Sequence, residues 1–242
     1  EKGHQVTLYE ASDKLGGNMR LAAYPPGKGD ITNMIRSYIV RCQKAGVTIK
    51  MNQEVTLDLI REEKPDSVIV ASGSRTLILP IEGIDNPAII HGSDLLDGKR
   101  AAGKKVLVVG GGMVGCETAA FLGEQNHDVT VIEFRDTVGA DVIHEHRVYL
   151  MKDFEDYKIK EITGAKVCKF YEDGVEYETA DGVRHESRGY DSVILSMGFR
   201  NYNPLEEKIK DLVPETHVIG DAIRARRALD ATKEAYEVAS RI

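Results

Sequence analysis

The chain has 242 residues and carries 32 Lys and Arg against 39 Asp and Glu, so its formal net charge is −7. Its content of 42% hydrophobic and 29% charged residues is typical of a globular protein with one large or two modest domains. The acidic balance argues against nucleic acid and anionic membranes as main partners. No apolar run approaches the ~20 residues needed to span a bilayer. Three scattered cysteines without a CxxC pair argue against a local metal or redox cluster and favour a reducing cytoplasm.

The sequence contains two copies of one pattern. Glu10 and Glu133 each end a short apolar run rich in β-branched residues, and they lie 123 residues apart. Gly73 and Gly198 each follow an Asp-Ser-Val-Ile run, and they lie 125 residues apart. Two pairs of matches at nearly one offset indicate an internal repeat. We therefore expect two tandem nucleotide-binding units.

The second copy contains a glycine-rich loop in a specific context. An apolar strand is predicted over 105–109 and runs into Gly-Gly-Gly-Met-Val-Gly, a GxGxxG pattern that starts at Gly110 and opens a helix ending near residue 125. Gly110 would allow the tight turn, Gly112 the approach of backbone N–H groups to a pyrophosphate, and Gly115 close packing of helix on strand. With Glu133 further along the chain, this context predicts a dinucleotide site rather than an ordinary strand–helix turn.

Two glutamates refine this prediction. Glu133 ends the second strand of the unit, where a carboxylate binds the adenosine ribose and repels a 2′-phosphate. This favours NADH over NADPH, although Arg135 two residues later opposes that preference. Glu117 lies in the first turns of the helix, where it is either a carboxylate favoured by the helix dipole or a group that faces the nicotinamide.

The repeat also predicts the domain organisation. Its offset places the first copy's glycine loop before residue 1, so we expect the chain to be a fragment of a longer polypeptide. A first, FAD-type domain is predicted from residues 1–76 and 199–242, with an NAD(P)H domain inserted at 77–198. The first strand of a doubly wound sheet is central, so without it the first domain should show a gap or a substitute strand.

Periodicity and turn signals give the remaining elements. Helices are predicted over 31–45, 57–63 and from 228 to the terminus, and further strands over 47–51, 68–71 and 217–219. The segments 165–171, 175–179 and 183–186 alternate in character and are joined by Asp-Gly turns, which predicts a three-stranded antiparallel meander. The expected fold is α/β, with two Rossmann-like, three-layer dinucleotide-binding domains.

Further candidate ligand residues lie near strand ends of the first copy, where open α/β sheets bind ligands. They are Glu10, Gly16, Gly17, Arg20, Ser72, Gly73, Gly220 and Asp221. Asp221 suits a ligand's polyol or phosphate, and equally a simple helix N-cap. His144-Glu145-His146 lacks an evident third ligand, so we predict no metal site. No Ser/His/Asp or paired-carboxylate arrangement is present, so no catalytic side chain is assigned.

These motifs, in this order, resemble the flavoprotein fold with two dinucleotide-binding domains. The chain is most similar to the C-terminal half of the NADH:flavin oxidoreductases related to 2,4-dienoyl-CoA reductase, enoate reductase and trimethylamine dehydrogenase. The resemblance covers essentially all 242 residues. In that family an N-terminal barrel carries FMN and an iron–sulfur (4Fe-4S) cluster, and the half resembled here binds FAD and NAD(P)H.

The resemblance implies roles for individual residues. Glu10, Gly16, Gly17, Arg20, Ser72, Gly73, Gly220 and Asp221 are expected to bind FAD. Gly110, Gly112, Met113, Val114, Gly115, Glu117, Glu133 and Gly198 are expected to bind NADH. Hydride would pass from the nicotinamide to the flavin, and the electrons would then reduce an activated C=C bond of an enoate or dienoyl substrate.

Two other functions stay open. In trimethylamine dehydrogenase-like members the corresponding site holds ADP and performs no hydride chemistry, so the chain could be a non-catalytic nucleotide-binding module. It could also be a free-standing NADH-dependent reductase of a small electron carrier. The barrel domain of the same parent chain, NAD(H), and FAD or ADP are the expected partners.

Overall fold

The computed structural model describes residues 2–242, which form two compact units. The first unit consists of the residues before Tyr24, Gly29–Arg75 and Phe199–Ile242, and the second unit consists of Tyr24–Lys28 and Thr76–Gly198. The short segment Tyr24–Lys28 therefore packs with the second unit although both of its neighbours belong to the first. Within residues 2–242, no helix has the length and apolar character needed to cross a bilayer.

The second unit is built on a five-stranded parallel sheet in the order β5-β12-β6-β7-β8. Its strands and helices are β5 (Ile90–His91), α4 (Gly92–Leu96), β6 (Lys105–Val109), α5 (Met113–Glu124), β7 (Asp128–Ile132), α6 (His144–Asp156), β8 (Lys160–Ile162) and β12 (Ser192–Leu195). The central strand β6 reads as a continuous apolar run, as expected for a parallel strand covered on both faces. The strand predicted over 105–109 is confirmed.

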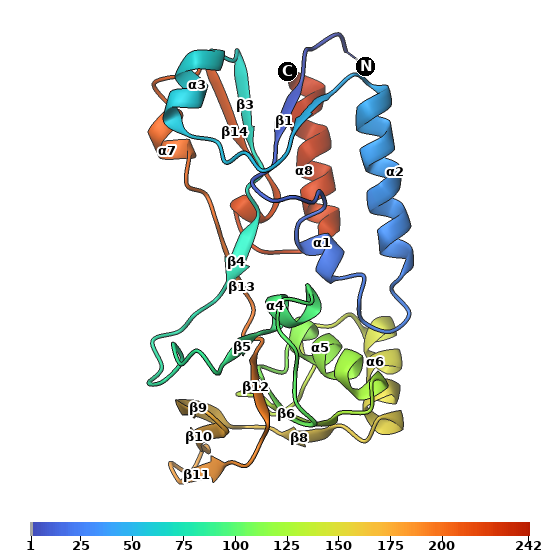
Figure 1. The fold of residues 1–242 in the computed structure, drawn as a ribbon, viewed down its shortest axis with the longest axis vertical. Helices are drawn as coiled ribbons and strands as arrows, with labels where there is room; N and C mark the ends of the chain where they lie inside the picture. Colours follow the sequence, from blue (N-terminus) through green and yellow to red (C-terminus); the bar gives the residue numbers. More distant parts are fainter. Residues whose placement is uncertain (1) are drawn as a thin grey trace. The chain divides into compact units, whose positions relative to one another are not determined.

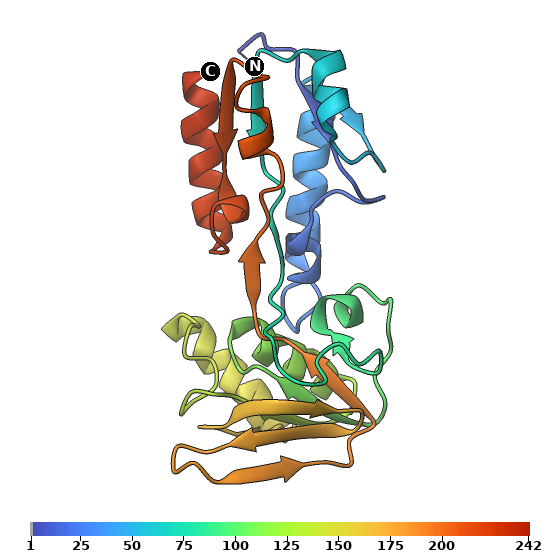
Figure 2. The ribbon, with the colours of Figure 1, turned by 90° about the vertical axis from the view of Figure 1, so that its left-hand side faces the viewer.

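The two faces of this sheet have separate cores. Val106 and Val108 of β6 belong to a cluster that includes residues of α5 and α6, whereas Leu107 and Val109 pack with Phe170 and other residues under the meander. Figures 1 and 2 show α5 and α6 on one side of the sheet and the β9–β11 layer on the other. The unit is therefore a three-layer α/β structure with one antiparallel layer.

The meander forms a sheet of its own. Its strands β9 (Lys166–Tyr171), β10 (Gly174–Glu178) and β11 (Arg184–Ser187) pair antiparallel in the order β11-β10-β9. A tight turn joins β9 to β10, because Gly174 pairs with Tyr171. The predicted three-stranded antiparallel insert is confirmed, and with it the α/β fold class.

The first unit contains short strand pairs instead of one sheet. Its elements are β1 (Thr7–Tyr9), α1 (Asn18–Leu21), α2 (Asp30–Lys44), β2 (Thr48–Lys50), α3 (Leu57–Glu63), β3 (Ser67–Val70), β4 (Ser74–Thr76), β13 (Phe199–Asn201), α7 (Glu206–Ile209), β14 (Glu215–Val218), the 3-10 helix η1 (Gly220–Ala222) and α8 (Ala228–Arg241). β1 pairs with β2 and β3 with β14, both in parallel, and β4 pairs with β13. Among the described residues, no strand joins the β1–β2 pair to the β3–β14 pair.

The first unit has a small core. Ile60, Val70, Ile209 and Val213 form one buried cluster under α3 and α7. By contrast, α2 and α8 are amphipathic in sequence, yet neither contains a buried residue. The apolar faces of these two helices are thus incompletely covered by the described part of the chain.

Candidate nucleotide-binding sites

The turn that follows β6 requires glycine at its first position. Gly110 has a φ of +107°, a region that L side chains rarely adopt, and its N–H donates to the carbonyl of Ile132 at 2.9 Å. A Cβ at Gly110 would overlap the carbonyl oxygen of Ser196. The chain that leaves β6 therefore passes between the segments at the ends of β7 and β12, and it can do so only because Gly110 has no side chain.

The last glycine of the loop sets the position of α5. An added Cβ at Gly115 would overlap the carbonyl oxygen of Gly110. Met113 and Val114 form the first two positions of α5, so their N–H groups belong to the helix end that has no intrahelical acceptors. The Met113 N–H donates to Oδ1 of Asp141 at 2.9 Å.

Glu133 lies directly beside the glycine loop. It follows β7, and its Oε2 accepts a hydrogen bond from the Gly111 N–H at 2.5 Å. Its Oε1 accepts from the Arg135 N–H at 2.9 Å. Two backbone donors therefore fix the carboxylate at the end of β7, where an adenosine ribose is expected.

Glu10 has a matching local arrangement in the first unit. It follows β1, and its Oε1 accepts from the Ser12 N–H at 2.8 Å, two residues later in the chain. The Ser12 hydroxyl donates to the same oxygen at 2.8 Å. Glu10 and Glu133 thus each follow a strand and each accept from the backbone N–H two residues later, which supports similar roles.

Glu117 is buried and paired with a lysine from a distant part of the sequence. Its side chain is 7% exposed, and its Oε1 accepts a hydrogen bond from Nζ of Lys28. Nε2 of His146 lies 3.9 Å from the same oxygen. Pro25 is buried and Tyr24 contacts Phe121 edge to face, so the Tyr24–Lys28 segment is anchored on α5. The segment reads as a surface loop from its prolines and glycines, and no local signal identifies Lys28 as the partner of Glu117.

Removing the Lys28 charge will destabilise the second unit. A Lys28→Met substitution leaves the buried Glu117 carboxylate without its cation, at an expected cost of about 1–3 kcal/mol in the free energy of unfolding. Adding Glu117→Gln to the same chain should recover part of that loss. Urea unfolding followed by circular dichroism measures both effects. Lys152→Met removes an exposed ion pair with Asp156 and serves as the control; equal losses from the two lysine variants would contradict the prediction.

Cys116 lies next to Glu117 and is fully buried. Its Sγ donates to the carbonyl of Gly111 at 3.2 Å. Burial raises the pKa of the Cys116 thiol to about 12, from an ordinary value of 9.0. The thiol is therefore protonated at neutral pH and packs as a small apolar group.

This burial predicts selective alkylation. At pH 8, iodoacetamide should modify the partly exposed Cys42 and Cys168, and should modify Cys116 only after unfolding. Because the unfolded thiol loses its proton near pH 9 and the folded thiol does so near 12, stability should also fall as the pH rises between these values. Peptide mass mapping with and without urea tests the first expectation. Rapid labelling of Cys116 in the folded protein would show that its burial is wrong.

In the first unit, Asp221 is part of a hydrogen-bonded cluster. Oδ2 of Asp221 accepts from the Ser74 hydroxyl at 3.0 Å, and Asn18 donates to the same hydroxyl at 3.1 Å. Oδ1 accepts from the Arg226 N–H at 3.0 Å. Asp221 lies in η1, and the N-cap position of α8 is Arg227. The interpretation of Asp221 as the N-cap of the last helix is therefore wrong, and Ser74 and Asn18 join the candidate site.

The predicted glycines divide into open and packed positions. At Gly17, Gly73 and Gly198 an added Cβ would have no atom within 4 Å. At Gly16 it would lie 3.0 Å from Cγ of Arg20, and at Gly220 it would lie 3.1 Å from Cβ of Ala231. Gly17, Gly73 and Gly198 are thus open in the direction of a Cβ, whereas Gly16 and Gly220 are packed against other residues in that direction.

Ser72, the remaining candidate of the first unit, lies at the end of β3. Its hydroxyl donates to the carbonyl of Tyr202 at 2.5 Å, and the Gly73 carbonyl accepts from the Tyr202 N–H at 2.9 Å. The Arg75 guanidinium lies 3.4 Å from the centroid of the Tyr202 ring. These contacts fix the backbone on both sides of Gly73, the glycine at which an added Cβ would meet no atom.

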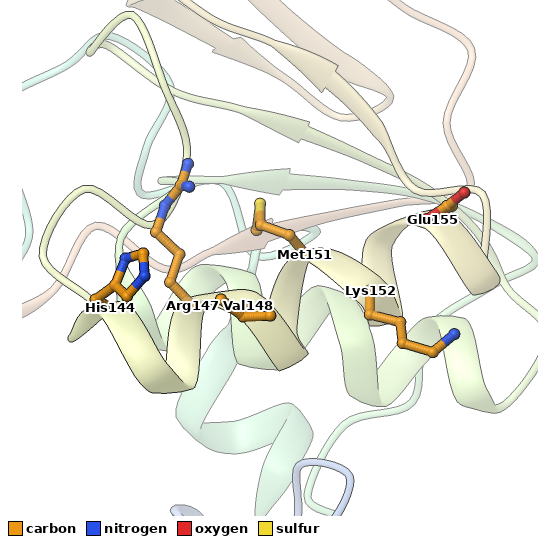
Figure 3. Close-up of a pocket in the computed structure, with 6 residues that line it drawn as sticks. All are labelled: His144, Arg147, Val148, Met151, Lys152 and Glu155. Carbon is orange, nitrogen blue, oxygen red and sulfur yellow. The ribbon is translucent and has the colours of Figure 1, made fainter.

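Two surface hollows accompany the second unit. One, of about 560 Å³, is lined only by residues of α6, and Figure 3 shows their side chains. They are His144, Arg147, Val148, Met151, Lys152 and Glu155. None of these is a predicted binding residue. His144 and His146 lie on a helix, not a strand, and no group of three or more potential metal ligands occurs within residues 2–242.

The other hollow begins immediately after Glu133 and measures about 470 Å³. Its lining residues are Phe134, Arg135, Asp136, Gly164, Lys166, Glu178, Thr179 and Ala180. The Phe134 side chain is largely exposed. This hollow, which the sequence did not reveal, is lined by the two residues that follow Glu133 in the chain.

Comparison with known proteins shows similarity along the whole chain. Cinnamate reductase of Clostridium sporogenes is 31% identical over 244 residues, covering 100% of this chain and 36% of the relative. NADH oxidase of Thermoanaerobacter brockii is 32% identical over 248 residues, covering 100% of this chain and 38% of the relative. A solved structure of 2-naphthoyl-CoA reductase superposes with a TM-score of 0.93 and 31% identity, covering 99% of this chain and 36% of the other.

The chain thus spans little more than a third of the length of these relatives. The similarity to 2-naphthoyl-CoA reductase confirms the predicted fold class. The family model described as pyridine nucleotide-disulphide oxidoreductase matches residues 1–220. On this match, together with the glycine loop and its carboxylate, the chain belongs to the pyridine nucleotide-disulphide oxidoreductase family.

Proposed function

We propose that the second unit binds NADH and the first unit binds FAD, as parts of a flavin-dependent reductase. The observation that carries this proposal is the position of Glu133. Its carboxylate is held by the N–H groups of Gly111 and Arg135, beside a turn where Gly110 admits no side chain. This arrangement offers a ribose acceptor and a helix N-terminus on one surface, which a dinucleotide requires.

The residues fit both cofactors. In the second unit, a Cβ at Gly198 would meet no atom, and the hollow lined by Phe134 and Arg135 offers space for an adenine close in sequence to Glu133. In the first unit, Gly17 and Gly73 are open, and Glu10 and Asp221 supply carboxylates for a ribose and a ribityl chain. When bound, the nicotinamide and flavin supply hydride chemistry, and the protein binds and orients them.

Glu133 supports a preference for NADH over NADPH. Its fixed carboxylate would repel a 2′-phosphate. The positively charged Arg135 side chain opposes this preference. The backbone N–H of the same residue supports it, because it holds the Glu133 carboxylate in place. We therefore expect the preference for NADH to be retained and not reversed.

The relatives support the substrate class of the whole protein. Two relatives are reductases of cinnamate and of 2-naphthoyl-CoA, and another is an NADH oxidase. We propose that the parent protein reduces an activated C=C bond in an enoate-type substrate. An N-terminal barrel with FMN and an iron–sulfur cluster would complete it, in the reducing cytoplasm.

One observation favours a second function. The Glu117 carboxylate already binds Lys28, so it is engaged and not free to face a nicotinamide. A site that uses only the adenosine and diphosphate end would bind ADP as well as NADH. The chain would then be a nucleotide-binding module without hydride chemistry.

Titration calorimetry of the protein with NADH, NADPH and ADP separates these functions. If the proposal is correct, NADH binds at least tenfold tighter than ADP and tighter than NADPH. Equal binding of NADH and ADP would instead assign the non-catalytic function. Anaerobic addition of NADH to the FAD-loaded protein provides a second test, since bleaching of the flavin band near 450 nm reports hydride transfer.

A further inference from the structure

An aspartate from the loop before α6 lies at the N-terminus of α5. Oδ1 of Asp141 accepts a hydrogen bond from the Met113 N–H at 2.9 Å. A Cβ built on Gly112 would lie 3.3 Å from Oδ2 and 3.5 Å from Oδ1 of the same carboxylate. The carboxylate therefore lies beside the third residue of the GxGxxG turn, Gly112, and the first residue of the helix, Met113.

This is the position expected for a diphosphate. The first N–H groups of a helix have no intrahelical acceptor, and together with the helix dipole they attract an anion. At α5 the Asp141 carboxylate supplies such an anion from within the chain. A bound diphosphate and Asp141 would therefore compete for the same donors and would repel each other.

The surroundings hold the backbone of Asp141 but leave its side chain free. Val138 and Val142 are buried on either side, and the Gly139 N–H donates to the carbonyl of Gly111 at 2.7 Å. Asp141 itself is exposed. Its side chain can thus rotate into solvent without disturbing the loop that carries it.

Among the described residues, no Lys, Arg or His forms an ion pair with Asp141. Arg147, six residues further along the chain, donates instead to the Thr137 hydroxyl at 2.9 Å and to the Val138 carbonyl at 3.1 Å. Within residues 2–242, Asp141 forms no ion pair, and its one hydrogen bond is to Met113. Its negative charge is therefore balanced only by the helix end.

We propose that Asp141 is an intramolecular competitor of the nucleotide diphosphate, one that lowers the affinity of the α5 N-terminus for phosphate-bearing ligands and favours their release. This inference rests on the proposed function, because it assumes that the loop binds a dinucleotide. The two proposals predict opposite effects of a substitution on nucleotide affinity. Removing a binding residue weakens binding, whereas removing Asp141 strengthens it.

The test compares ADP with adenosine in variants of the protein. Asp141→Asn keeps an acceptor for the Met113 N–H but removes the charge, and Asp141→Ala removes both. Either variant should lower the Kd for ADP about tenfold, as expected for loss of one like charge near a helix end. The Kd for adenosine, which has no phosphate, should not change. Glu145→Gln makes the same change in net charge on an exposed side chain of α6 and should leave both constants unaltered.

The outcomes separate the two proposals. Unchanged or weaker ADP binding in both Asp141 variants, with wild-type binding that still depends on Glu133, overturns the role of Asp141 alone. A similar gain for adenosine would also overturn it, because the effect would not involve phosphate. If neither the wild type nor any Asp141 variant binds ADP or NADH, both proposals fail.

Discussion

Replacing Gly115 with alanine will destabilise the second unit and abolish NADH binding. The new Cβ would overlap the Gly110 carbonyl oxygen, so the start of α5 must move away from the turn after β6. The position of a Cβ is fixed by its own backbone, and the Gly110 carbonyl is itself backbone, so no change of rotamer can relieve the overlap. We expect a loss of roughly 3 kcal/mol or more in the free energy of unfolding, at the upper end for overpacking.

Gly29→Ala is the matched control for this experiment. Gly29 also lies at the N-terminal end of a helix, as the N-cap of α2, but it has a φ of −53° and an added Cβ would have no atom within 4 Å. The Gly29→Ala protein should keep an unfolding midpoint in urea and a Kd for NADH close to those of the wild type. A Gly115→Ala protein with wild-type stability would show that the helix start is not packed on the turn as described.

Replacing Glu133 with alanine will weaken NADH binding by about 1–3 kcal/mol, or roughly 5- to 150-fold in Kd. The substitution removes the acceptor for the ribose hydroxyls, and it also leaves the N–H groups of Gly111 and Arg135 without their partner. Loss of the carboxylate further removes the repulsion of a 2′-phosphate. The ratio of the dissociation constants for NADPH and NADH should therefore fall towards one.

Fluorescence titration of the reduced nucleotides measures both effects. Glu124→Ala removes an exposed carboxylate at the opposite end of α5 and provides the control. The ribose assignment requires that only the Glu133 variant loses affinity. An unchanged dissociation constant in that variant would remove the observation on which the proposed function depends.

Features with strong local signals could be predicted from the sequence. The apolar run of β6 followed by a GxGxxG turn defines a strand, a loop and a helix within about 20 residues. The Asp-Gly turns of the meander likewise fix two hairpins, because they join segments of alternating character. The parallel order of the sheet follows from the internal repeat and from the fold that it resembles.

Contacts between distant segments could not be predicted. Lys28 and Glu117 are 89 residues apart, and Asp141 reaches Met113 across 28 residues. Each contact depends on the path of a loop that carries no periodic signal. A buried carboxylate does require a partner, but the sequence offers 32 Lys and Arg and does not indicate which one.

The distinction between open and packed glycines also needs coordinates. Gly16 and Gly17 are adjacent and identical in type, yet an added side chain would meet Arg20 and Ile35 at the first and nothing at the second. The difference arises from the direction in which each Cα–H bond points. A motif alone therefore does not indicate which of its glycines are packed against other residues.

The separate strand pairs of the first unit have a consequence for amide hydrogen exchange. Within residues 2–242, β1 and β3 each pair with a single strand, so one edge of each has no neighbouring strand, and the side chains of Val6, just before β1, and Ile69, in β3, are exposed. Such edges open at low energetic cost and can also pair with another chain. Deuterium should therefore enter β1 and β3 well before it enters β6 and β12, and concentrated solutions should self-associate through the first unit.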